Sequence, residues 1–247
     1  MSNEPKGAMH FEGRKSIGAM EAAENQRRWD EKHYQTVNKK PLHWYDITRA
    51  HLNFEVAKGG IIQKIGTSKP VEERFKERLE ELGVKPNPEV KKNDPIAAKM
   101  SNQIVEFVFS GDHEVMNMMA FGNQAVDFER DGTADNSHIQ RMNEIEQWAI
   151  DLYDWMTKKY GEENIIGFDV HLDETTAHCH ATIIPVVMRT EKKTGRERPV
   201  VSYKGLFGKD KATGQEIMKQ LHTELCEQVN NKYGLMRALS IDFDTSE

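Results

Sequence analysis

The sequence predicts an α+β fold in which a central antiparallel β-sheet is flanked by helices. The first observation is IVEFVF at 104–109, a run of β-branched and aromatic residues that is typical of a strand. The second is a pair of β-rich runs at 165–172 and 178–187, joined by the polar connector DETT as in an antiparallel hairpin. The third is a long helix expected from about 139 to 160, where apolar residues recur at three- and four-residue steps and Gly161 ends the pattern.

The elements of the amino-terminal part are expected from local composition. Residues 1–18 suit a short strand followed by a glycine-containing loop, and a helix rich in Ala, Glu, Gln and Arg is expected at 19–34. A break at 38–41 separates this helix from a strand within 44–56, where apolar residues alternate in HLNFEV.

The middle and the end of the chain add two more helices. A surface helix is expected at 71–82 because Gly83, a residue favoured just past a helix end, follows it. Three prolines come next, and we expect a single domain over 1–247 with a linker or excursion at 58–100. The last helix is expected at 214–233, with one apolar stripe.

Composition excludes several classes of protein. Hydrophobic residues are 37% and charged residues 30% of the 247, a polar but globular mixture. No apolar run approaches the ~18 residues of a membrane span, and the amino terminus lacks the apolar core of a secretory signal. Cys179 and Cys226 are the only cysteines, too few for a disulfide framework or a thiolate zinc site. We therefore expect a protein of the reducing cytoplasm.

The charge balance bears on nucleic-acid binding. A formal net charge of −6 argues against a protein that coats nucleic acid indiscriminately. It leaves room for a local basic surface at 189–211, where eight Lys or Arg residues stand against three Asp or Glu residues. This segment is either a solvated loop or part of a groove for nucleic acid.

The residues with the clearest chemistry lie in HLDETTAHCH, residues 171–180. Residues two apart in a strand project from one face, so His178 and His180 point together while Cys179 points into the core. The hairpin brings His171 back opposite the start of the second strand. Three imidazoles then meet on one face of two strands, which suits a divalent metal.

Two carboxylates occupy the turn of this hairpin. Glu174 is placed to act as a general base or to orient a ligand, and Asp173 either does the same or caps the turn. Three neutral ligands leave a metal its full charge and open coordination positions. Such a site suits an anionic oxygen, and a scissile phosphate is a natural candidate.

This hairpin resembles the core motif of a known family. HLDETTAHCHATIIP is similar to the H-x-D-E-x-T-P-H-x-H motif of the Mob/Pre plasmid mobilisation relaxases of the MOBV type. Ala177 stands where that motif has proline, which should loosen the turn. RAHLNFE at 49–55 is similar to the family segment S-H-L-N-Y-E, and VSYKGLF at 201–207 resembles the region before its next helix. The resemblance extends from about residue 9 to residue 235.

Members of this family are histidine-hydrophobic-histidine (HUH) nucleases, so the resemblance implies the HUH-type relaxase fold. It also implies an enzyme that nicks one DNA strand at an origin of transfer, in plasmid mobilisation and conjugation, and stays attached to the 5′ phosphate. His171, His178 and His180 would hold Mn²⁺, which imidazole ligands favour, or Mg²⁺. Glu174 matches the family's acid/base residue, and Asp173 a position with a supporting role.

The implied partner is plasmid DNA at the origin of transfer, bound as a hairpin or duplex arm beside a single-stranded nick region. The candidate DNA contacts are basic and polar residues near the matched motifs. They are Arg14, Lys15, Arg28, Arg49, His51, Asn53 and Lys204. No membrane insertion is expected, and a homodimer through a C-terminal region not present in this sequence stays open.

The sequence departs from the family at the residue that attacks phosphorus. Well-matched members carry H-N-x-R on a helix, and its histidine is the nucleophile. Here the matching residues are Glu24, Asn25 and Arg27, and a register one residue later supplies no histidine either. We take these three as catalytic candidates, with Glu24 as a nucleophile that would form an acyl phosphate.

Other nucleophiles stay open at this point. Tyr34, Tyr45 and His10 are alternatives, whereas His33 would point elsewhere on a continuous helix because it lies nine residues beyond Glu24. The tyrosine that some members carry after H-L-N is a phenylalanine here.

Three other functions also stay open. The first is a replication-initiation nuclease of the same superfamily, which would nick at a replication origin. The second is a DNA-binding module that has lost cleavage together with its nucleophile. The third is a metal enzyme of another kind, such as a cupin, which the long helices oppose.

Overall fold

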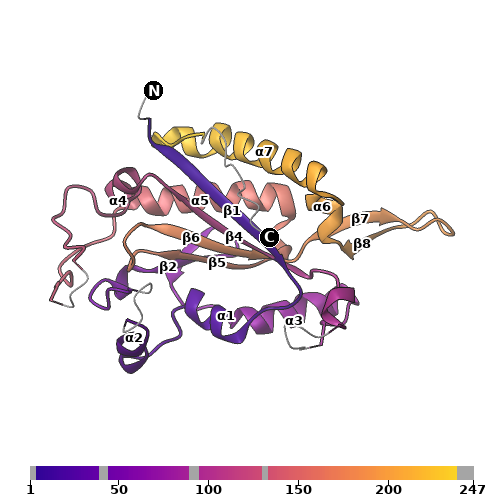
Figure 1. Cartoon of the computed structure of the whole chain (residues 1–247), viewed down its shortest axis with the longest axis horizontal. Helices are drawn as coiled ribbons and strands as arrows, with labels where there is room; N and C mark the ends of the chain where they lie inside the picture. The colour runs from indigo at the N-terminus through magenta and orange to yellow at the C-terminus, as the bar shows by residue number, and fades with distance from the viewer. Residues whose placement is uncertain (1–3, 39–43, 89–94, 130–132, 238–247) are drawn as a thin grey trace.

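The computed structural model describes residues 4–38, 44–88, 95–129 and 133–237, and its centre is a seven-stranded sheet (Figure 1). The strand order is β3-β2-β5-β6-β4-β1-β9, and the pairings are antiparallel apart from that of β1 with β9. The strands are β1 (Lys6–Arg14), β2 (Phe54–Ala57), β3 (Ile61–Lys64), β4 (Ile104–Gly111), β5 (Ile165–His171), β6 (His178–Ile183) and β9 (Met236–Arg237). Two further strands, β7 (Val186–Thr190) and β8 (Glu197–Val201), form a separate ribbon.

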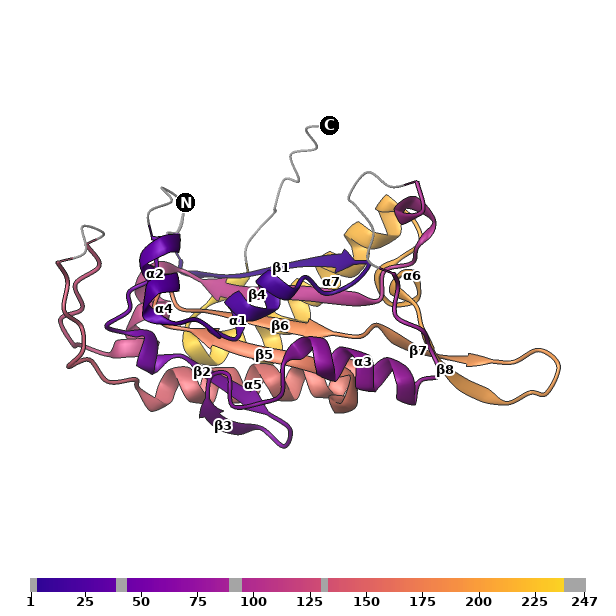
Figure 2. The same cartoon turned by 90° about the horizontal axis from the view of Figure 1, so that it is seen from below.

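Helices flank the sheet on both sides, so the predicted α+β architecture is confirmed. The α-helices are α1 (Ala19–Asn25), α2 (Glu31–Val37), α3 (Val71–Glu81), α4 (His113–Phe121), α5 (Asn143–Tyr160), α6 (Tyr203–Phe207) and α7 (Lys211–Gln228). Four short 3₁₀ turns are η1 (Ala50–Leu52), η2 (Ala97–Lys99), η3 (Glu162–Asn164) and η4 (Asn230–Tyr233). Helices α5 and α7 lie on one face of the sheet, and α1 and α3 lie on the other (Figures 1 and 2). Among the helices that the structure describes, none is long and apolar enough to cross a membrane.

The main core lies between the sheet and the α5/α7 layer. Alternate strand residues such as Phe107 and Phe109 point into it, where they meet aromatic side chains including Trp155 of α5. A smaller apolar cluster sits under α1 and α3. On that side of the sheet, His10 of β1 and His180 of β6 pair with the same residue of β4 and are exposed and half-buried, respectively. The helices therefore leave part of this face open, and the histidines lie on it.

The helix expected at 19–34 is two helices, which is a correction. Helix α1 ends at Asn25 because Arg27 takes a left-handed conformation, with φ of 48°. Gln26 is fully buried, and its side-chain oxygen accepts a hydrogen bond from the backbone N–H of Val71 at 2.9 Å. Because α2 restarts in a new direction, the argument that places His33 on a continuous helix is wrong. Except for its first residue, the expected break at 38–41 lies outside the described residues.

Several other boundaries differ from expectation. The helix expected at 71–82 is confirmed as α3, and its Phe75 and Leu79 are buried against the sheet. The rest of 58–100 was expected as a linker or excursion, but it also contains β3. The strand expected at 178–187 divides at Ile184 and Pro185 into β6 and β7. The basic segment 189–211 is not a plain loop, because β8, α6 and the end of β7 lie in it. Helix α4 was not predicted, since nine residues offer too short a window for helical periodicity.

Candidate metal and nuclease site

Three histidine rings meet at the turn end of the β5–β6 hairpin. His171 and His178 are directly opposed in the strand register, and His180 follows on the same face of β6. The three ring centroids are 5.0–5.1 Å apart, and each residue offers one nitrogen within 4.8 Å of the other two. Cys179 points the other way into the core, where burial raises the pKa of its thiol well above the usual value. The structure thus brings together the residues that the sequence predicted to meet, and their role as metal ligands stays a prediction.

Two backbone carbonyls set the protonation of the histidine rings. His171 Nε2 lies 2.7 Å from the carbonyl oxygen of Asn25, and His178 Nδ1 lies 2.9 Å from that of Thr176. A carbonyl can only accept, so both of these nitrogens carry the proton and donate. In the neutral rings the other two nitrogens, His171 Nδ1 and His178 Nε2, carry lone pairs, and they face each other at 3.3 Å. Two facing lone pairs repel, and a cation between them would remove that repulsion, so the neutral donor set fits a divalent metal.

The surroundings keep two of the rings neutral. Burial, followed by the neighbouring His178 and the charges of Arg27 and Arg14, lowers the pKa of His180 to about 3. Burial also lowers the pKa of His171 well below its usual value, with Arg27 as the next contribution. Neutral imidazole is the form that binds a metal, so protons do not compete at these two residues near neutral pH.

The two carboxylates of the turn have different surroundings. Glu174 is partly exposed, and its Oε1 lies 3.5 Å from His178 Nε2 and 3.7 Å from His171 Nδ1. Asp173 is fully buried, and both of its oxygens accept hydrogen bonds from Arg27 at 2.9 Å. Glu174 is therefore the carboxylate at the site, whereas Asp173 anchors the turn from below.

Arg27 connects the end of α1 to the histidine hairpin. Beyond its fork on Asp173, its Nη2 donates to Glu174 Oε1 at 2.6 Å, and its Nη1 donates to the carbonyl of Glu24 at 2.8 Å. The guanidinium also lies 4.7 Å from the centre of the Tyr45 ring. The left-handed backbone at Arg27 is what aims this side chain at the hairpin. A buried charge with this many partners is a positioning element, and the neighbouring carboxylates raise its pKa further.

The candidate nucleophile Glu24 lies beside Arg27 with a phenol as partner. Tyr45 donates a short hydrogen bond to Glu24 Oε1, and Tyr34 is hydrogen-bonded to Asp173. Both tyrosines are buried, while Glu24 is partly exposed. Burial and the bonds to carboxylates raise the pKa of both phenols. Of these three groups, Glu24 is therefore the one that faces solvent, whereas both phenols keep their protons near neutral pH.

Arg49 and Asn53 have a different place from the one expected. Both are buried, so the structure corrects the expectation that they contact DNA. The Arg49 guanidinium pairs with Asp46 at 2.8 Å and donates to the carbonyls of Leu172 and Glu174. The Asn53 side-chain oxygen accepts from the backbone N–H of Leu172 at 2.6 Å and from that of Asp173 at 3.2 Å. The RAHLNFE segment thus braces the histidine turn.

The remaining expected DNA contacts lie at the surface. His51 is exposed, and Arg28 pairs with Glu72 of α3 at 2.7 Å. Arg14 is shared among three glutamates, namely Glu12 and Glu106 of the open sheet face and Glu21 of α1. Two lysines, Lys15 and Lys204, line one surface pocket at the base of the β7–β8 ribbon. The structure does not bring these residues together into one patch with the histidines.

Helix α4 supplies contacts that the sequence did not predict. Asn117 donates to the carbonyl of Thr175 at 3.1 Å and accepts from the N–H of Ala177 at 3.4 Å. His113 is hydrogen-bonded to the hydroxyl of Thr176. A proline at position 177 would have no N–H to donate. The hydrogen bonds of Asn117 therefore offset the loosening of the turn expected from Ala177. These bonds were not expected from the sequence, because α4 was not predicted.

Comparison with known proteins gives one family match over part of the sequence and several matches of the whole fold. The sequence model of the Mob_Pre family, described as plasmid recombination enzyme, matches residues 122–238. No curated protein matches the chain. Among solved structures, a manganese-bound MobM relaxase domain (MOBV; Mob_Pre) with plasmid pMV158 oriT DNA at pH 6.8 has a TM-score of 0.60 at 17% identity, over 98% of this chain and 94% of that one. The pH 5.5 structure of that domain has a TM-score of 0.57 at 18% identity, with the same coverage.

Proposed function

The chain contains a Mob_Pre region within the fold of a MOBV relaxase domain, and we propose that it is a metal-dependent DNA relaxase. Its reaction is the nicking of one DNA strand at an origin of transfer, with transfer of the 5′ phosphate to the protein, in plasmid mobilisation. The observation that carries the proposal is the three-histidine centre, in which each residue offers one ring nitrogen within 4.8 Å of the other two. The partner is plasmid DNA, as in the solved MobM complexes with oriT DNA.

Manganese is the metal that this donor set favours. Three imidazoles are softer ligands than the carboxylate and water oxygens that magnesium prefers. The matching MobM structures contain manganese as well. When bound, the ion supplies Lewis-acid stabilisation to the oxygens of the scissile phosphate.

The residues of the chain set the geometry around that phosphate. The carbonyls of Asn25 and Thr176 hold two imidazoles in the tautomers that bind a metal. Arg27 fixes Glu174 beside the rings and also holds the backbone of Glu24. In its protonated form, Glu174 would give its proton to the departing 3′ oxygen, and the resulting carboxylate would take a proton back from the 3′ hydroxyl when the strand is rejoined.

Glu24 is the proposed nucleophile. Its carboxylate oxygen forms a bond to phosphorus, the P–O3′ bond breaks, and the 3′ oxygen leaves with a proton. The product is an acyl phosphate, whose high transfer potential allows the strand to be rejoined. Tyr45 orients Glu24 through its hydrogen bond, which makes it a positioning residue.

Relaxation of a supercoiled plasmid tests the function. The plasmid carries the transfer origin of the element that encodes this protein, and Mn²⁺ is added. Conversion to the nicked form is expected, and its loss with chelator shows the need for metal. Tight binding of the origin without relaxation would instead identify a DNA-binding module that has lost cleavage. Nicking at a replication origin but not at the transfer origin would identify the replication-initiation alternative.

Peptide mapping tests the nucleophile. The protein is incubated with a nick-site oligonucleotide and Mn²⁺, digested, and examined by mass spectrometry for the residue that carries the phosphate. An adduct on Glu24, absent in Glu24→Gln, is expected. An adduct on Tyr45, Tyr34, His33 or His10 would overturn the assignment of Glu24 while leaving the relaxase function intact.

A further inference from the structure

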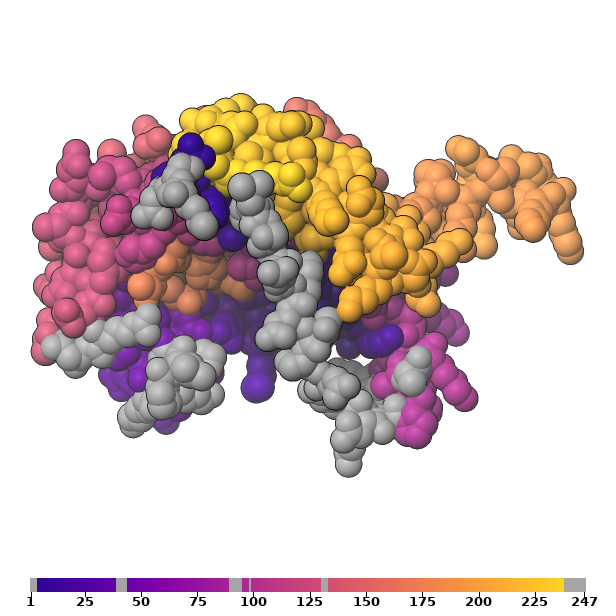
Figure 3. Space-filling view, turned by 45° about the horizontal axis from the view of Figure 1, so that its top comes forward, coloured from indigo at the N-terminus to yellow at the C-terminus, as the bar shows by residue number. Residues whose placement is uncertain are grey.

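A two-stranded ribbon projects from the body of the protein, away from the histidine centre. Strands β7 and β8 pair only with each other, and the ribbon stands out from the molecule in the space-filling view (Figure 3). Residues 188–199 are all exposed. Only the base is anchored, where Val186 and Val201 pack against the apolar cluster under α3. An isolated two-stranded hairpin is marginal in water, so this arm adds little to the stability of the fold.

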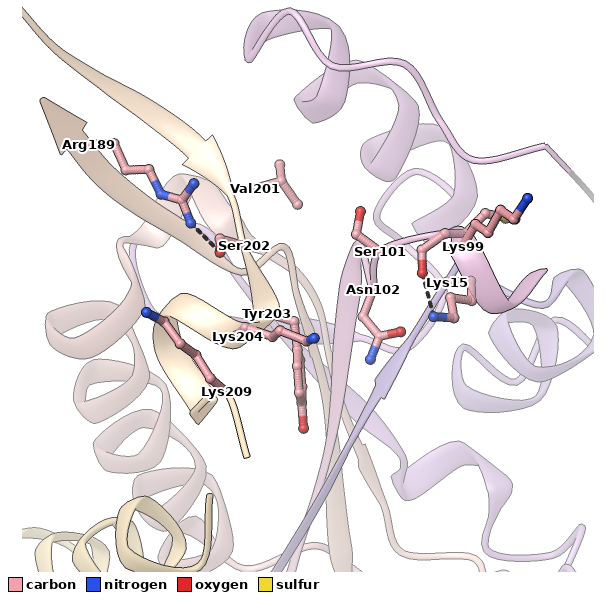
Figure 4. Close-up of a pocket in the computed structure, with 11 residues that line it drawn as sticks. Lys15, Lys99, Ser101, Asn102, Arg189, Val201, Ser202, Tyr203, Lys204 and Lys209 are labelled. Atoms are coloured by element: carbon pink, nitrogen blue, oxygen red, sulfur yellow. Dashed lines mark hydrogen bonds between the residues drawn. The ribbon is translucent and has the colours of Figure 1, made fainter. Parts of the chain in front are cut away.

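The charges on the ribbon are arranged unfavourably for a free arm. Residues 186–201 carry five Lys or Arg residues against two Glu residues, a local charge of +3. Arg189 and Arg198 are directly opposed in the register, so they project from the same face. Arg189 also donates a hydrogen bond to the Ser202 hydroxyl at 3.0 Å, which contact with a base edge would replace (Figure 4). Like charges directly across a strand pair destabilise it. Glu191 accepts a hydrogen bond from Thr194 within the turn, which commits its carboxylate to local structure. An anion bound over the arginine pair would relieve the repulsion.

A basic pocket continues this surface at the base of the ribbon. It has a volume of about 510 Å³ and lies between the ribbon and α6 on one side and β1 and η2 on the other (Figure 4). Its cations come from four parts of the chain and are Lys15, Lys99, Arg189, Lys204 and Lys209. No Asp or Glu is among the residues that line it. Because Gly13 has no side chain, Tyr203 and Asn102 lie against β1 and form a wall of the pocket.

Resting on the proposed function, we infer that the β7–β8 ribbon enters the major groove of duplex DNA next to the nick region. The basic pocket at its base holds the backbone of the same duplex. The ribbon and the pocket would thus bind a part of the DNA that the histidine centre does not cut. Arg189 and Arg198 would contact base edges, and the lysines of the pocket would contact phosphates.

The dimensions and the residue types favour a duplex over a single strand. A five-residue strand is about 17 Å long, and the major groove, about 12 Å wide and 8.5 Å deep, admits a two-stranded ribbon. Arginine pairs with the O6 and N7 acceptors of guanine in that groove. A single strand is bound mainly by free aromatic faces, and the exposed stretch 188–199 contains no aromatic residue. Tyr203 in the pocket is already stacked on Phe207.

Binding to duplex and single-stranded DNA tests the inference. The probe is a fluorescein-labelled duplex of mixed sequence, about two helical turns long, and each of its separated strands, measured by anisotropy in EDTA. Arg189→Ala/Arg198→Ala is expected to weaken duplex binding about tenfold or more and to leave single-strand binding little changed. Lys99→Ala/Lys209→Ala should lower the slope of log K against log salt by about two.

A charge-matched variant provides the control. Lys58→Ala/Arg237→Ala also removes two exposed positive charges, but these lie outside the ribbon and the pocket, and duplex binding should stay near wild type. Prior occupation of the major groove by methyl green should block the wild-type protein, whereas netropsin in the minor groove should not. Circular dichroism and thermal melting verify that each variant is folded.

Two outcomes would overturn the inference. Wild-type duplex affinity in Arg189→Ala/Arg198→Ala means that the ribbon does not contact DNA. Equal losses on the duplex and on the separated strands assign this surface to single-stranded DNA instead. Because binding is measured without metal, a protein that fails to nick still reports on the ribbon. Failure of the proposed function is thus distinguishable from failure of this inference.

Discussion

The histidine centre and the β7–β8 ribbon are both candidates for contact with DNA, yet they are built in opposite ways. The histidines lie on inner strands of a seven-stranded sheet, and the protons on two rings are set by backbone carbonyls. The ribbon is a separate sheet whose outer part is wholly exposed. Buried hydrogen bonds fix the geometry of the histidine centre, whereas exposed positive charge is the main feature of the ribbon.

The difference suits the two functions proposed for these regions. Chemistry on phosphorus requires ligands and carboxylates held to fractions of an ångström, which a braced and buried setting provides. Binding to a charged backbone requires positive charge at the surface, which a projecting arm can supply. We therefore expect changes at the centre to alter activity or stability strongly, and changes at the ribbon to alter binding and its salt dependence.

The largest effect is expected at the centre. His178→Ala/His180→Ala removes two of the three proposed ligands, so nicking should fall by about a hundredfold or more, together with Mn²⁺ uptake. Calorimetry with Mn²⁺ and the plasmid relaxation assay measure the two losses. His138→Ala, at an exposed position, is the control and should behave as wild type. Undiminished Mn²⁺ binding in the double variant would refute the metal centre.

The next effect tests the bracing of the centre. Arg27→Ala leaves the fully buried Asp173 without its positively charged partner, so the free energy of unfolding should fall by about 3–5 kcal/mol. The neighbouring Arg28→Ala breaks only a surface pair and should cost about 0–1 kcal/mol. Urea denaturation of both variants gives the comparison. Similar losses would mean that the Arg27 pairing does not brace the site.

A carboxylate on the open sheet face predicts a pH dependence. Burial and the neighbouring Glu21, against the opposing charge of Arg14, raise the pKa of Glu106 to about 7. A raised carboxyl pKa means that the folded state holds the proton more tightly. The protonated Glu106 therefore contributes its full stabilisation of the folded state below the unfolded pKa near 4.5. This stabilisation, up to about 3 kcal/mol, is lost as the pH rises to about 7.

Denaturation at two pH values checks this. Wild type should lose more stability between pH 5 and pH 8 than Glu106→Gln, which has no carboxyl to ionise at this position. Equal pH dependence in the two proteins would show that Glu106 titrates normally. Glu106→Gln also changes the contact of residue 106 with Arg14 at both pH values. For each protein, only the change in stability between pH 5 and pH 8 is therefore compared.

The smallest effect is expected at the ribbon. Lys192→Glu/Lys193→Glu changes two exposed turn residues. The free energy of unfolding should therefore stay within about 0.5 kcal/mol of the wild-type value, and the melting temperature should change little. Affinity for duplex DNA should fall and become less sensitive to salt. Calorimetric melting and anisotropy give the two quantities. A clear loss of stability would show that the ribbon is part of the folded body and would remove the contrast.

The parts of the fold predicted from sequence are those with a strong local pattern. The strand at 104–109 and the histidine hairpin have β-rich composition, and the helix that became α5 has a long helical periodicity. Helix α4, the turn at Arg27 and the β7–β8 ribbon have no such local pattern. The DNA-contact assignment of Arg49 and Asn53 was wrong because composition does not show that a polar side chain is buried and already paired.

By itself, the sequence determined which residues share a strand face, and so which imidazoles meet, because alternation in a hairpin is a local property. It also determined that no histidine occupies the 24–27 motif. Only the tertiary structure decided that Arg27 reaches Asp173 across 146 positions and that Tyr45 holds Glu24. These contacts depend on how α1 ends and docks on the sheet, and long-range packing rather than local preference selects that arrangement.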